Sequence, residues 1–494
     1  MSSSIKPRVV LKFGGSSVSS LDKWETIAGL VGDRLTKGER LLIVHSALKG
    51  VTDNLELLPV EAAAGRHAPL LEELIARHLD LCEEMGLDGR SLLEADFEKL
   101  SLAVEGIALV QEVNPRIRAR ILAFGEHLST RIGAAFLASR ELPVKWLDAR
   151  DLLAAVDTGR QSGSAVWLSA ECEAELDTEV RDRLDALPGP GLTQGFTARG
   201  LDGDTVVLGR GGSDTAAAYL AGKWGADRIE IWSDVSGMFT ADPRVVPTAR
   251  LLRRLDYREA QEIATTGSQV LHPRAVRALR DREIPIHLRS TVDPSAPGTV
   301  IEATGTEGPA QVKAISRKRK VVLVSMETLG MWQEVGFLAR AFRVFEEAGV
   351  SVDLVSTSET NVTVSLDSGA ALLDDEILGK LHENLSSFCG VQFIRPCAAV
   401  SLVGNRIRAL LHRMGPALEA FEEHRVHLVS QAASDLNLTV VVDEAQADDL
   451  LRALHELLIP AAGLAGEADS EVFGASWEAL AGSAAMASSS GDPG

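Results

Sequence analysis

The sequence predicts an α/β domain with a mainly parallel sheet, followed by two small domains of the βαββαβ type. Over residues 9 to about 300, short apolar β-branched runs alternate with longer helical patterns, an order typical of parallel sheets covered by helices. The composition then shifts to Pro, Gly, Ser and Thr over Pro294–Gly308, which indicates a linker. Beyond it, one order of strands and helices occurs twice, which indicates a tandem pair of split βαβ sandwiches.

The elements of the first domain follow from their apolar patterns. A long helical pattern covers Arg116–Ser139. Leu201-Asp202-Gly203-Asp204 is a hairpin turn signal, and we expect it to lead the chain from Leu192–Phe196 back through Thr205–Leu208. Further strands are predicted from short β-branched runs at Val9–Leu11, Arg40–His45, Val144–Leu147 and Arg228–Trp232.

The two βαββαβ copies are predicted from the same kind of pattern. The first has strands Val321–Met326, Val350–Val355, Val362–Leu366 and Val391–Ile394 and helices Phe337–Ala348 and Ala371–Leu385. The second has strands Ala399–Val403, Val426–Ser430 and Leu438–Val442 and helices Ile407–His424 and Gln446–Leu457. This second copy lacks its last strand. Val312–Ile315 can supply it, in which case the first copy is inserted into the second.

These patterns give domain boundaries at residues 1–305 for the α/β domain, 306–397 for the linker and first small domain, and 398–460 for the second. Residues 311–319 are the candidates to complete the second small domain. After Leu458 the chain is rich in Ala, Gly and Ser, so residues 461–494 are expected to be a disordered tail or a linker to a further domain.

Composition excludes several classes of protein. The net charge of −20 argues against a nucleic-acid partner, and the basic run Arg317-Lys318-Arg319-Lys320 is interpreted as a solvated linker. The four cysteines form no C-x-x-C pair and no H-E-x-x-H motif occurs, so neither a disulfide framework nor a zinc site is expected. No signal-peptide core and no window of about 18 apolar residues occurs, so we expect no membrane span and a cytoplasmic location.

Two glycine-rich stretches are the strongest candidates for a ligand site. Lys12-Phe13-Gly14-Gly15-Ser16-Ser17 and Gly209-Arg210-Gly211-Gly212-Ser213-Asp214 each follow an apolar strand pattern and lead toward a helical segment. A strand, a glycine turn and a helix N-terminus together present backbone N–H groups to an anion. Neither stretch matches the P-loop or the dinucleotide-binding motif. Two such turns predict a site for several phosphate and carboxylate groups.

Lys12–Val18 resembles the N-terminal signature of the aspartokinases, in which threonine usually stands where this chain has Ser16. Further stretches of that family recur in order at Gly125-Glu126, Gly209–Asp214, Ser233–Gly237, Thr240–Arg244 and Val270–Pro273, and the resemblance covers about residues 8–459. It implies an amino-acid-kinase α/β/α sandwich followed by two ferredoxin-like ACT modules. It also implies ATP-dependent phosphorylation of the β-carboxylate of L-aspartate to 4-phospho-L-aspartate, the first step of lysine, threonine and methionine biosynthesis.

The resemblance assigns roles to individual residues. Lys12 and Asp214 are the catalytic candidates, since a lysine on a glycine turn can bridge the transferring phosphate and the acceptor carboxylate. Arg210 is assigned to the α-carboxylate of aspartate and Glu126 to its ammonium. The other substrate-binding candidates are Ser46, Thr52 and Ser213. ATP is expected to bring Mg²⁺ without a dedicated metal cage, and the nucleotide-binding candidates are Lys12, Gly14, Gly15, Ser16, Gly211, Gly212, Ser233, Asp234, Phe239, Asp242, Arg244 and Gln269.

Two nucleotide candidates depart from the family pattern. Phe239 stands where many relatives have tyrosine, and we expect its ring to stack on or edge the adenine. Gln269 stands where lysine is common. Because glutamine carries no positive charge, either Arg244 and Mg²⁺ suffice or nucleotide affinity is reduced.

The C-terminal half resembles the lysine-sensitive aspartokinases. That resemblance implies feedback inhibition by L-lysine and a homo-oligomer formed through the ACT modules. The effector-binding candidates are Met331, Gly336, Phe337, Leu338, Ser351, Val352, Asp353, Thr357 and Ser358.

Three alternatives stay open at this point. A glutamate or acetylglutamate kinase would share the catalytic fold, but the doubled ACT region and Glu126 argue against it. The chain can also be the kinase half of a bifunctional enzyme fused to homoserine dehydrogenase or diaminopimelate decarboxylase. A catalytically silent amino-acid sensor is the third alternative, and the presence of Lys12 and Arg210 argues against it.

Overall fold

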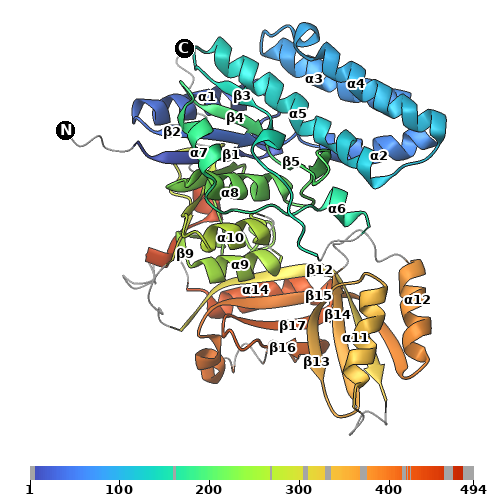
Figure 1. The fold of residues 1–494 in the computed structure, drawn as a ribbon. Coiled ribbons are helices and arrows are strands. Elements are labelled where there is room, and N and C mark those ends of the chain that lie inside the picture. The colour runs from blue at the N-terminus through green and yellow to red at the C-terminus, as the bar shows by residue number, and fades with distance from the viewer. Residues whose placement is uncertain are drawn as a thin grey trace.

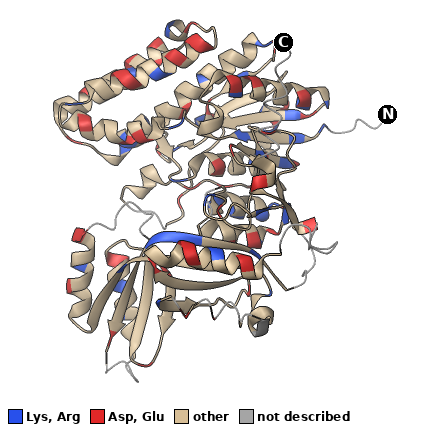
Figure 2. Ribbon diagram, turned by 180° about the vertical axis from the view of Figure 1, so that it is seen from behind, with Lys and Arg blue, Asp and Glu red and all other residues tan. Residues whose placement is uncertain are grey.

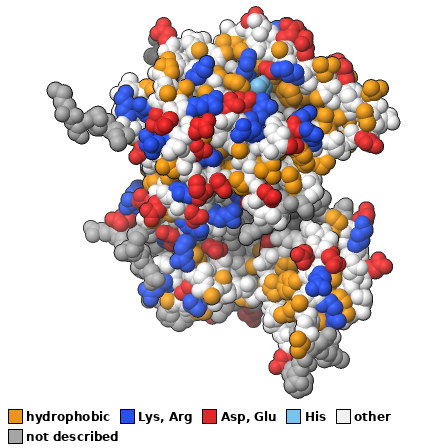
Figure 3. Space-filling model, viewed as in Figure 1, with side chains coloured by type: hydrophobic (Ala, Val, Ile, Leu, Met, Phe, Trp, Pro, Cys, Tyr) orange, Lys and Arg blue, Asp and Glu red, His pale blue; other side chains and the backbone are white. Residues whose placement is uncertain are grey.

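The computed structural model describes residues 6–159, 163–267, 270–303, 310–328, 335–367, 375–413, 415, 419, 421–422, 424–460 and 471–481. An α/β domain lies above a smaller, mostly antiparallel domain, and the long strand β12 (Gln311–Glu327) lies where the two meet (Figure 1). Among the described residues, no helix is both long and apolar enough to cross a lipid bilayer. On the face drawn in Figure 3, basic and acidic side chains are interspersed over the α/β domain.

The α/β domain is built on an eight-stranded sheet with the order β3-β4-β2-β1-β7-β10-β11-β9. Neighbouring strands run parallel from β3 to β10, and β11 is antiparallel to β10. The strands are β1 Arg8–Phe13, β2 Arg40–His45, β3 Lys145–Leu147, β4 Gly191–Gln194, β7 Arg228–Ser233, β9 Arg254–Leu255, β10 Ile286–Ser290 and β11 Thr299–Ile301.

Helices cover both faces of this sheet (Figure 1). One face packs against α1 Leu21–Thr36 and α5 Pro115–Ser139. Outside them, α2 Val51–Ala63, α3 Ala68–Glu84 and α4 Gly89–Val110 pack on α5 and on one another. The other face packs against α7 Thr178–Asp185, α8 Gly212–Trp224, α9 Tyr257–Thr265 and α10 Pro273–Arg280. Within β1, Leu11 packs in the core that contains α1 to α5, and Val10 packs in the core on the opposite face, with α7 to α10. A sheet buried on both faces needs continuous apolar strands, which explains the pattern of β1.

Two strands differ from the sequence prediction. The turn at residues 201–204 is a hairpin turn, but it joins β5 (Thr197–Arg199) to β6 (Thr205–Val207), whereas β4 stays in the main sheet. The linker expected at Pro294–Gly308 contains β11, which pairs with β10 and β9. Turn residues mark where a strand ends, but they do not reveal its pairing partner.

The C-terminal domain is one antiparallel sheet with the order β13-β14-β12-β15-β17-β16. The strands expected at Val312–Ile315 and Val321–Met326 are parts of one long strand, β12. Those expected at Val391–Ile394 and Ala399–Val403 are parts of another, β15 (Gly390–Asn405). Residues 311–318 of β12 lie beside residues 399–405 of β15, the position proposed for the missing strand of the second copy. The other elements are β13 Val352–Thr357, β14 Asn361–Asp367, β16 Val426–Ser430, β17 Asn437–Asp443, α11 Phe337–Glu347, α12 Asp375–Ser386 and α14 Ala447–Leu458.

The α-helix expected over Ile407–His424 is wrong at its start. A 3₁₀ helix covers Ile407–Arg413, and several of the following residues lie outside the described part of the chain. Asp435 fixes this start, because its carboxylate accepts the backbone N–H of Arg408 at 2.7 Å.

The basic run at residues 317–320 lies inside β12, in the blue stretch of that strand in Figure 2, and not in a solvated linker. Arg317 and Arg319 form ion pairs with Asp448 of α14, and Lys318 pairs with Asp353 of β13 at 2.7 Å. The linker interpretation is therefore wrong, because the acidic partners come from segments far away in the sequence.

The tail is also structured in part, which contradicts the expectation of disorder for residues 471–481. Strand β18 (Phe473–Ser476) pairs antiparallel with β8 (Arg250–Leu252) of the α/β domain. Phe473 is 2% exposed, and Trp477 packs edge-to-face on Phe239 with ring centroids 5.4 Å apart. Two aromatic side chains thus anchor a segment whose surroundings are mostly Ala, Gly and Ser.

The buried guanidinium of Arg250 binds this tail. It donates to the carbonyl oxygens of Pro460, Phe473 and Gly474, each at 3.1 Å. A buried charge needs such acceptors, since it has left water. The tail strand therefore completes the hydrogen bonding of a charged group in the α/β domain.

We expect deletion of residues 471–494 to lower the melting temperature by several degrees. The deletion removes the buried ring of Phe473, worth about 3–5 kcal/mol, and two carbonyl acceptors of Arg250. Differential scanning calorimetry measures the change, and deletion of residues 482–494 alone is the matched control. Equal melting temperatures for the two deletions would contradict the packing of β18.

Candidate active site

The two glycine turns come together at the carboxyl edge of the parallel sheet. The last residue of β1, Phe13, lies opposite His45 of β2 and Trp232 of β7. The residues that follow these strands therefore emerge at one edge, which is where open α/β sheets bind ligands. The backbone N–H of Gly14 donates to the carbonyl of Trp232 at 3.2 Å, which joins the first turn to the end of β7.

Lys12 and Asp214 link the first turn to the second. Lys12 Nζ lies 2.5 Å from Asp214 Oδ1, and the side chains are only 10% and 14% exposed. Asp214 stands in the first turn of α8, which Gly211 caps with a φ of 65°. A β-carbon on Gly211 would collide with the ring of His272, so glycine is required there. The turn thus brings the positive end of α8 beside the ion pair.

Glu126 of α5 belongs to the same group of side chains. Its carboxylate accepts the hydroxyl proton of Ser213 at Oε1, while Oε2 is buried without a hydrogen-bond partner among the described residues. Burial raises the pKa of Glu126 to about 8, against the hydrogen bond from Ser213 and the positive charge of Lys12. A ligand cation beside Oε2 would favour the ionised form, so the site fits an ammonium group.

The remaining substrate candidates come from three further segments. Ser46 follows β2, and its backbone N–H donates to the carbonyl of Phe13 at 3.1 Å. Thr52 lies in the first turn of α2. Arg210 is exposed and forms no ion pair with another described residue. Its planar guanidinium is therefore available to a ligand carboxylate.

Part of the nucleotide set lies at the same edge. Gly14, Gly15 and Ser16 form the turn after β1, Gly211 caps α8, and Gly212 is its first residue. Ser233 ends β7 and Asp234 follows it as an exposed carboxylate. The two turns and the end of β7 thus surround the Lys12–Asp214 pair.

Phe239 contacts the tail and Asp242 contacts the C-terminal domain, whereas Arg244 is mostly exposed. Phe239 is 9% exposed and packs on Trp477, which leaves little of its ring open to an adenine. Asp242 pairs with Arg244 at 3.0 Å and with Arg317 of β12 at 3.6 Å. The Arg244 side chain is 82% exposed. Gln269 lies outside the described residues.

The effector candidates divide between a helix start and a sheet edge. Gly336 caps α11 with a φ of 95°. Phe337 is buried on Phe388, so its role here is packing, whereas Leu338 is exposed. Met331 lies outside the described residues. The others lie on or beside β13, an edge strand, and are Ser351, Val352, Asp353, Thr357 and Ser358.

Sequence reasoning missed Gly195, which directly follows β4. A β-carbon there would lie 2.7 Å from Cβ of Ser213 and 2.9 Å from Oε2 of Glu126. Only glycine leaves room for these two side chains to meet. A glycine inside an apolar strand pattern is the signal for such a close approach, but the sequence prediction placed it within Leu192–Phe196.

Comparisons with known proteins agree with this geometry. The model of the amino acid kinase family matches residues 7–290, and an ACT domain model matches residues 324–371. Aspartokinase 1 of Arabidopsis thaliana is 32% identical over 461 residues, covering 90% of this chain and 79% of the relative. Lysine-sensitive aspartokinase 3 of Escherichia coli is 31% identical over 454 residues, covering 91% of this chain and 99% of the relative.

A solved structure is similar over the same range. The structure of E. coli aspartokinase III with aspartate and ADP, described as the R-state, is 30% identical and has a TM-score of 0.79. It covers 92% of this chain and all of the solved chain. The ordered motifs, the joined glycine turns and these matches show that the chain belongs to the aspartokinases, within the amino acid kinase family.

Proposed function

We propose that this chain is an aspartate kinase that transfers the γ-phosphoryl group of ATP to the β-carboxylate of L-aspartate. The observation that carries the proposal is the buried carboxylate of Glu126 beside the Lys12–Asp214 pair, with the free guanidinium of Arg210 on the adjoining turn. This set offers an anion for an amino group and cations for carboxylate and phosphate. Aspartate and ADP occupy the related structure of E. coli aspartokinase III.

Each substrate group has a proposed partner. Arg210 binds the α-carboxylate in a bidentate manner, and Glu126, held by Ser213, receives the ammonium. Ser46 and Thr52 lie next to the acceptor carboxylate. This carboxylate is already a nucleophile, so the reaction needs no general base and depends on positioning and charge.

Lys12 is proposed to move with the reaction. In the free enzyme Asp214 neutralises it, and in the complex its ammonium bridges the acceptor carboxylate and the transferring phosphoryl group. The carboxylates of Asp214 and Asp234 would hold a Mg²⁺ ion that keeps most of its waters, and such an ion would supply positive charge to the phosphates. Arg244, on an exposed side chain, remains the candidate for the nucleotide phosphates.

The regulatory assignment rests on the relatives. E. coli aspartokinase III has also been solved with lysine and aspartate, described as the T-state, at 29% identity, a TM-score of 0.71, and 92% and 99% coverage of the two chains. We propose L-lysine as the effector, bound near β13, and a homo-oligomer formed through the ACT modules. The proposed domains are residues 1–305 for catalysis, 306–397 for the first module, with residues 311–319 completing the second, and 398–460 for the second.

Removal of Lys12 and of Arg210 should have different kinetic effects. Lys12→Ala should lower kcat by at least about 100-fold, because its charge acts on the transferring group. Arg210→Ala should raise the KM for aspartate roughly 10- to 150-fold, the equivalent of about 1.5–3 kcal/mol for a charge-assisted pair. Trapping of the acyl phosphate with hydroxylamine measures both, and exposed Lys37→Ala is the control. A kcat of Lys12→Ala within twofold of the wild-type value would overturn the role assigned to Lys12. A higher kcat/KM for glutamate than for aspartate would overturn the assignment of aspartate as the substrate.

The kcat/KM for aspartate should rise with pH toward a plateau above about pH 8. Burial raises the pKa of Glu126 to about 8, so below that value binding of the substrate ammonium must first remove a proton. A pH profile of kcat/KM measures this dependence. The Glu126→Gln enzyme should have a lower kcat/KM for aspartate at every pH, and its kcat/KM should not rise with pH. The same rise in both enzymes would show that another group titrates.

Lysine inhibition should depend on the Lys318–Asp353 pair. Lys318 Nζ forms an ion pair with the carboxylate of Asp353 at 2.7 Å, so the ammonium group of an effector has to compete with Lys318 for this carboxylate. Asp353→Ala should abolish inhibition without changing the uninhibited kcat. Lys318→Gln should instead lower the half-inhibitory lysine concentration by up to about fivefold, the value of an exposed pair. Steady-state titrations decide this, and unchanged inhibition of Asp353→Ala would exclude the site.

A further inference from the structure

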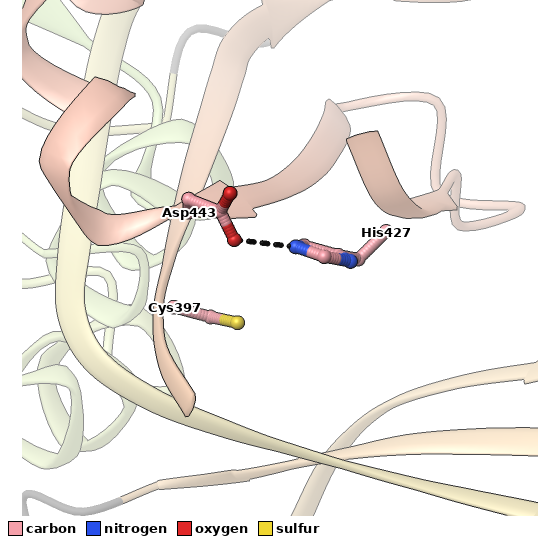
Figure 4. A group of neighbouring side chains, drawn as sticks. All are labelled: Cys397, His427 and Asp443. Carbon is pink, nitrogen blue, oxygen red and sulfur yellow. Dashed lines mark hydrogen bonds and ion pairs between the residues drawn. The ribbon is translucent and has the colours of Figure 1, made fainter. Parts of the chain in front are cut away.

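Three side chains that share no sequence motif come together at one end of the C-terminal sheet. Cys397 of β15, His427 of β16 and Asp443 of β17 offer ligand atoms that all lie within 4.8 Å of one another. His427 Nε2 and Asp443 Oδ1 are 2.7 Å apart, and the thiol of Cys397 lies beside this pair (Figure 4). We call these residues the Cys–His–Asp cluster.

The strand register explains how the cluster forms. Cys397 and Asp443 are directly opposite each other in the antiparallel pair β15–β17, so their side chains share one face of the sheet. His427 lies in an irregularity of the β16–β17 pairing, where Val426 faces Val442 but Leu428 faces Val441. Such a bulge redirects a side chain, and here it brings the imidazole to the carboxylate of Asp443.

The three donors match one class of ligand. Thiolate, imidazole and carboxylate are the donors that Zn²⁺ uses, and three protein ligands leave a fourth position for water. Bond lengths of about 2.0–2.3 Å in a tetrahedral site place the ligand atoms about 3.3–3.6 Å apart. The His427–Asp443 contact has to lengthen from 2.7 Å and the thiol has to move closer from within 4.8 Å. The first change is below about 1 Å and the second is at most about 1.5 Å, both within reach of side-chain rotation.

The surroundings also suit a metal ion. Cys397 is fully buried and the His427 side chain is 5% exposed, whereas the Asp443 side chain is 44% exposed. A metal ion can therefore enter from the solvent side past Asp443, and its fourth coordination position would face solvent. Burial raises the pKa of the Cys397 thiol to about 11, and the nearby charges of Asp443 and Glu444 add to this effect. A bound dication would oppose those charges and favour the thiolate.

We propose that Cys397, His427 and Asp443 bind one Zn²⁺ ion, which joins β15, β17 and the edge strand β16. The ion would fix the edge of the second ACT module without entering the catalytic domain. This proposal does not depend on the proposed kinase reaction, because none of the three residues lies at the carboxyl edge of the parallel sheet. It departs from the expectation of no zinc site, which rested on motif spacing alone.

The test is a titration of the full-length chain, first treated with a chelator, with Co²⁺ and then with Zn²⁺. Co²⁺ should bind with a stoichiometry of one and give thiolate-to-cobalt charge-transfer absorption together with the intense visible bands of tetrahedral cobalt. Zn²⁺ should displace Co²⁺ and raise the melting temperature with concentration. Absence of the charge-transfer band in the wild-type chain would overturn the proposal.

Variants locate the ion. Cys397→Ser and His427→Gln should each weaken Zn²⁺ binding by more than about 100-fold, since even loss of a residue that only supports a ligand costs 10- to 100-fold. Asp443→Asn should weaken it as well. Cys389→Ser is the matched control. Both thiols donate to a backbone carbonyl, Cys389 to Leu385 and Cys397 to Ile394, but Cys389 is not in the cluster. The Cys389→Ser variant should therefore bind Zn²⁺ like the wild type. Circular dichroism and kinase activity verify that each variant is folded. An unchanged cobalt spectrum in both Cys397→Ser and His427→Gln would place the metal elsewhere and overturn the assignment.

Discussion

The parallel register of β1 with β2 and β7 is the constraint on which the catalytic half depends. It aligns Phe13 with His45 and Trp232, so that three loops emerge at one edge and Lys12 reaches Asp214. Lysine and carboxylate are each expensive to bury alone, and their contact makes a closely packed, polar site possible. A one-residue slip of β1 would turn Lys12 to the opposite face of the sheet, and the second glycine turn would lose its partner.

The structure of the regulatory half depends in the same way on the pairing of two long strands. β12 and β15 each run through both βαββαβ units, and their pairing extends over nearly their whole length. The units therefore share one sheet and cannot move as separate bodies without bending these strands. The bulge near Lys318 and Val321 marks the crossover, and the Lys318–Asp353 and Arg319–Asp448 ion pairs lie there. β13 and α14 are thus connected through two neighbouring residues of β12, Lys318 and Arg319.

Helix α14 then connects this sheet to the catalytic domain. Its His455 lies 2.8 Å from the hydroxyl of Thr240, next to Phe239 and the tail residue Trp477. Residues 239–250 are consequently held between the second ACT module and β18. Four residues separate this segment from Asp234, so the packing around Phe239 lies close along the chain to the end of β7 at the candidate site.

The order of the elements and the two glycine turns could be predicted from the sequence alone. Strand β2 and the starts of α5 and α11 depend on local apolar periodicity and turn residues, and Lys12, Glu126 and Arg210 stand in short ordered motifs. Which distant segments meet becomes visible only in the folded chain. The Arg317 and Lys318 ion pairs, the covering of Phe239 by Trp477, the close approach at Gly195 and the Cys397–His427–Asp443 cluster all join residues far apart in the chain. Strand pairing and burial create these contacts, and no local spacing encodes them.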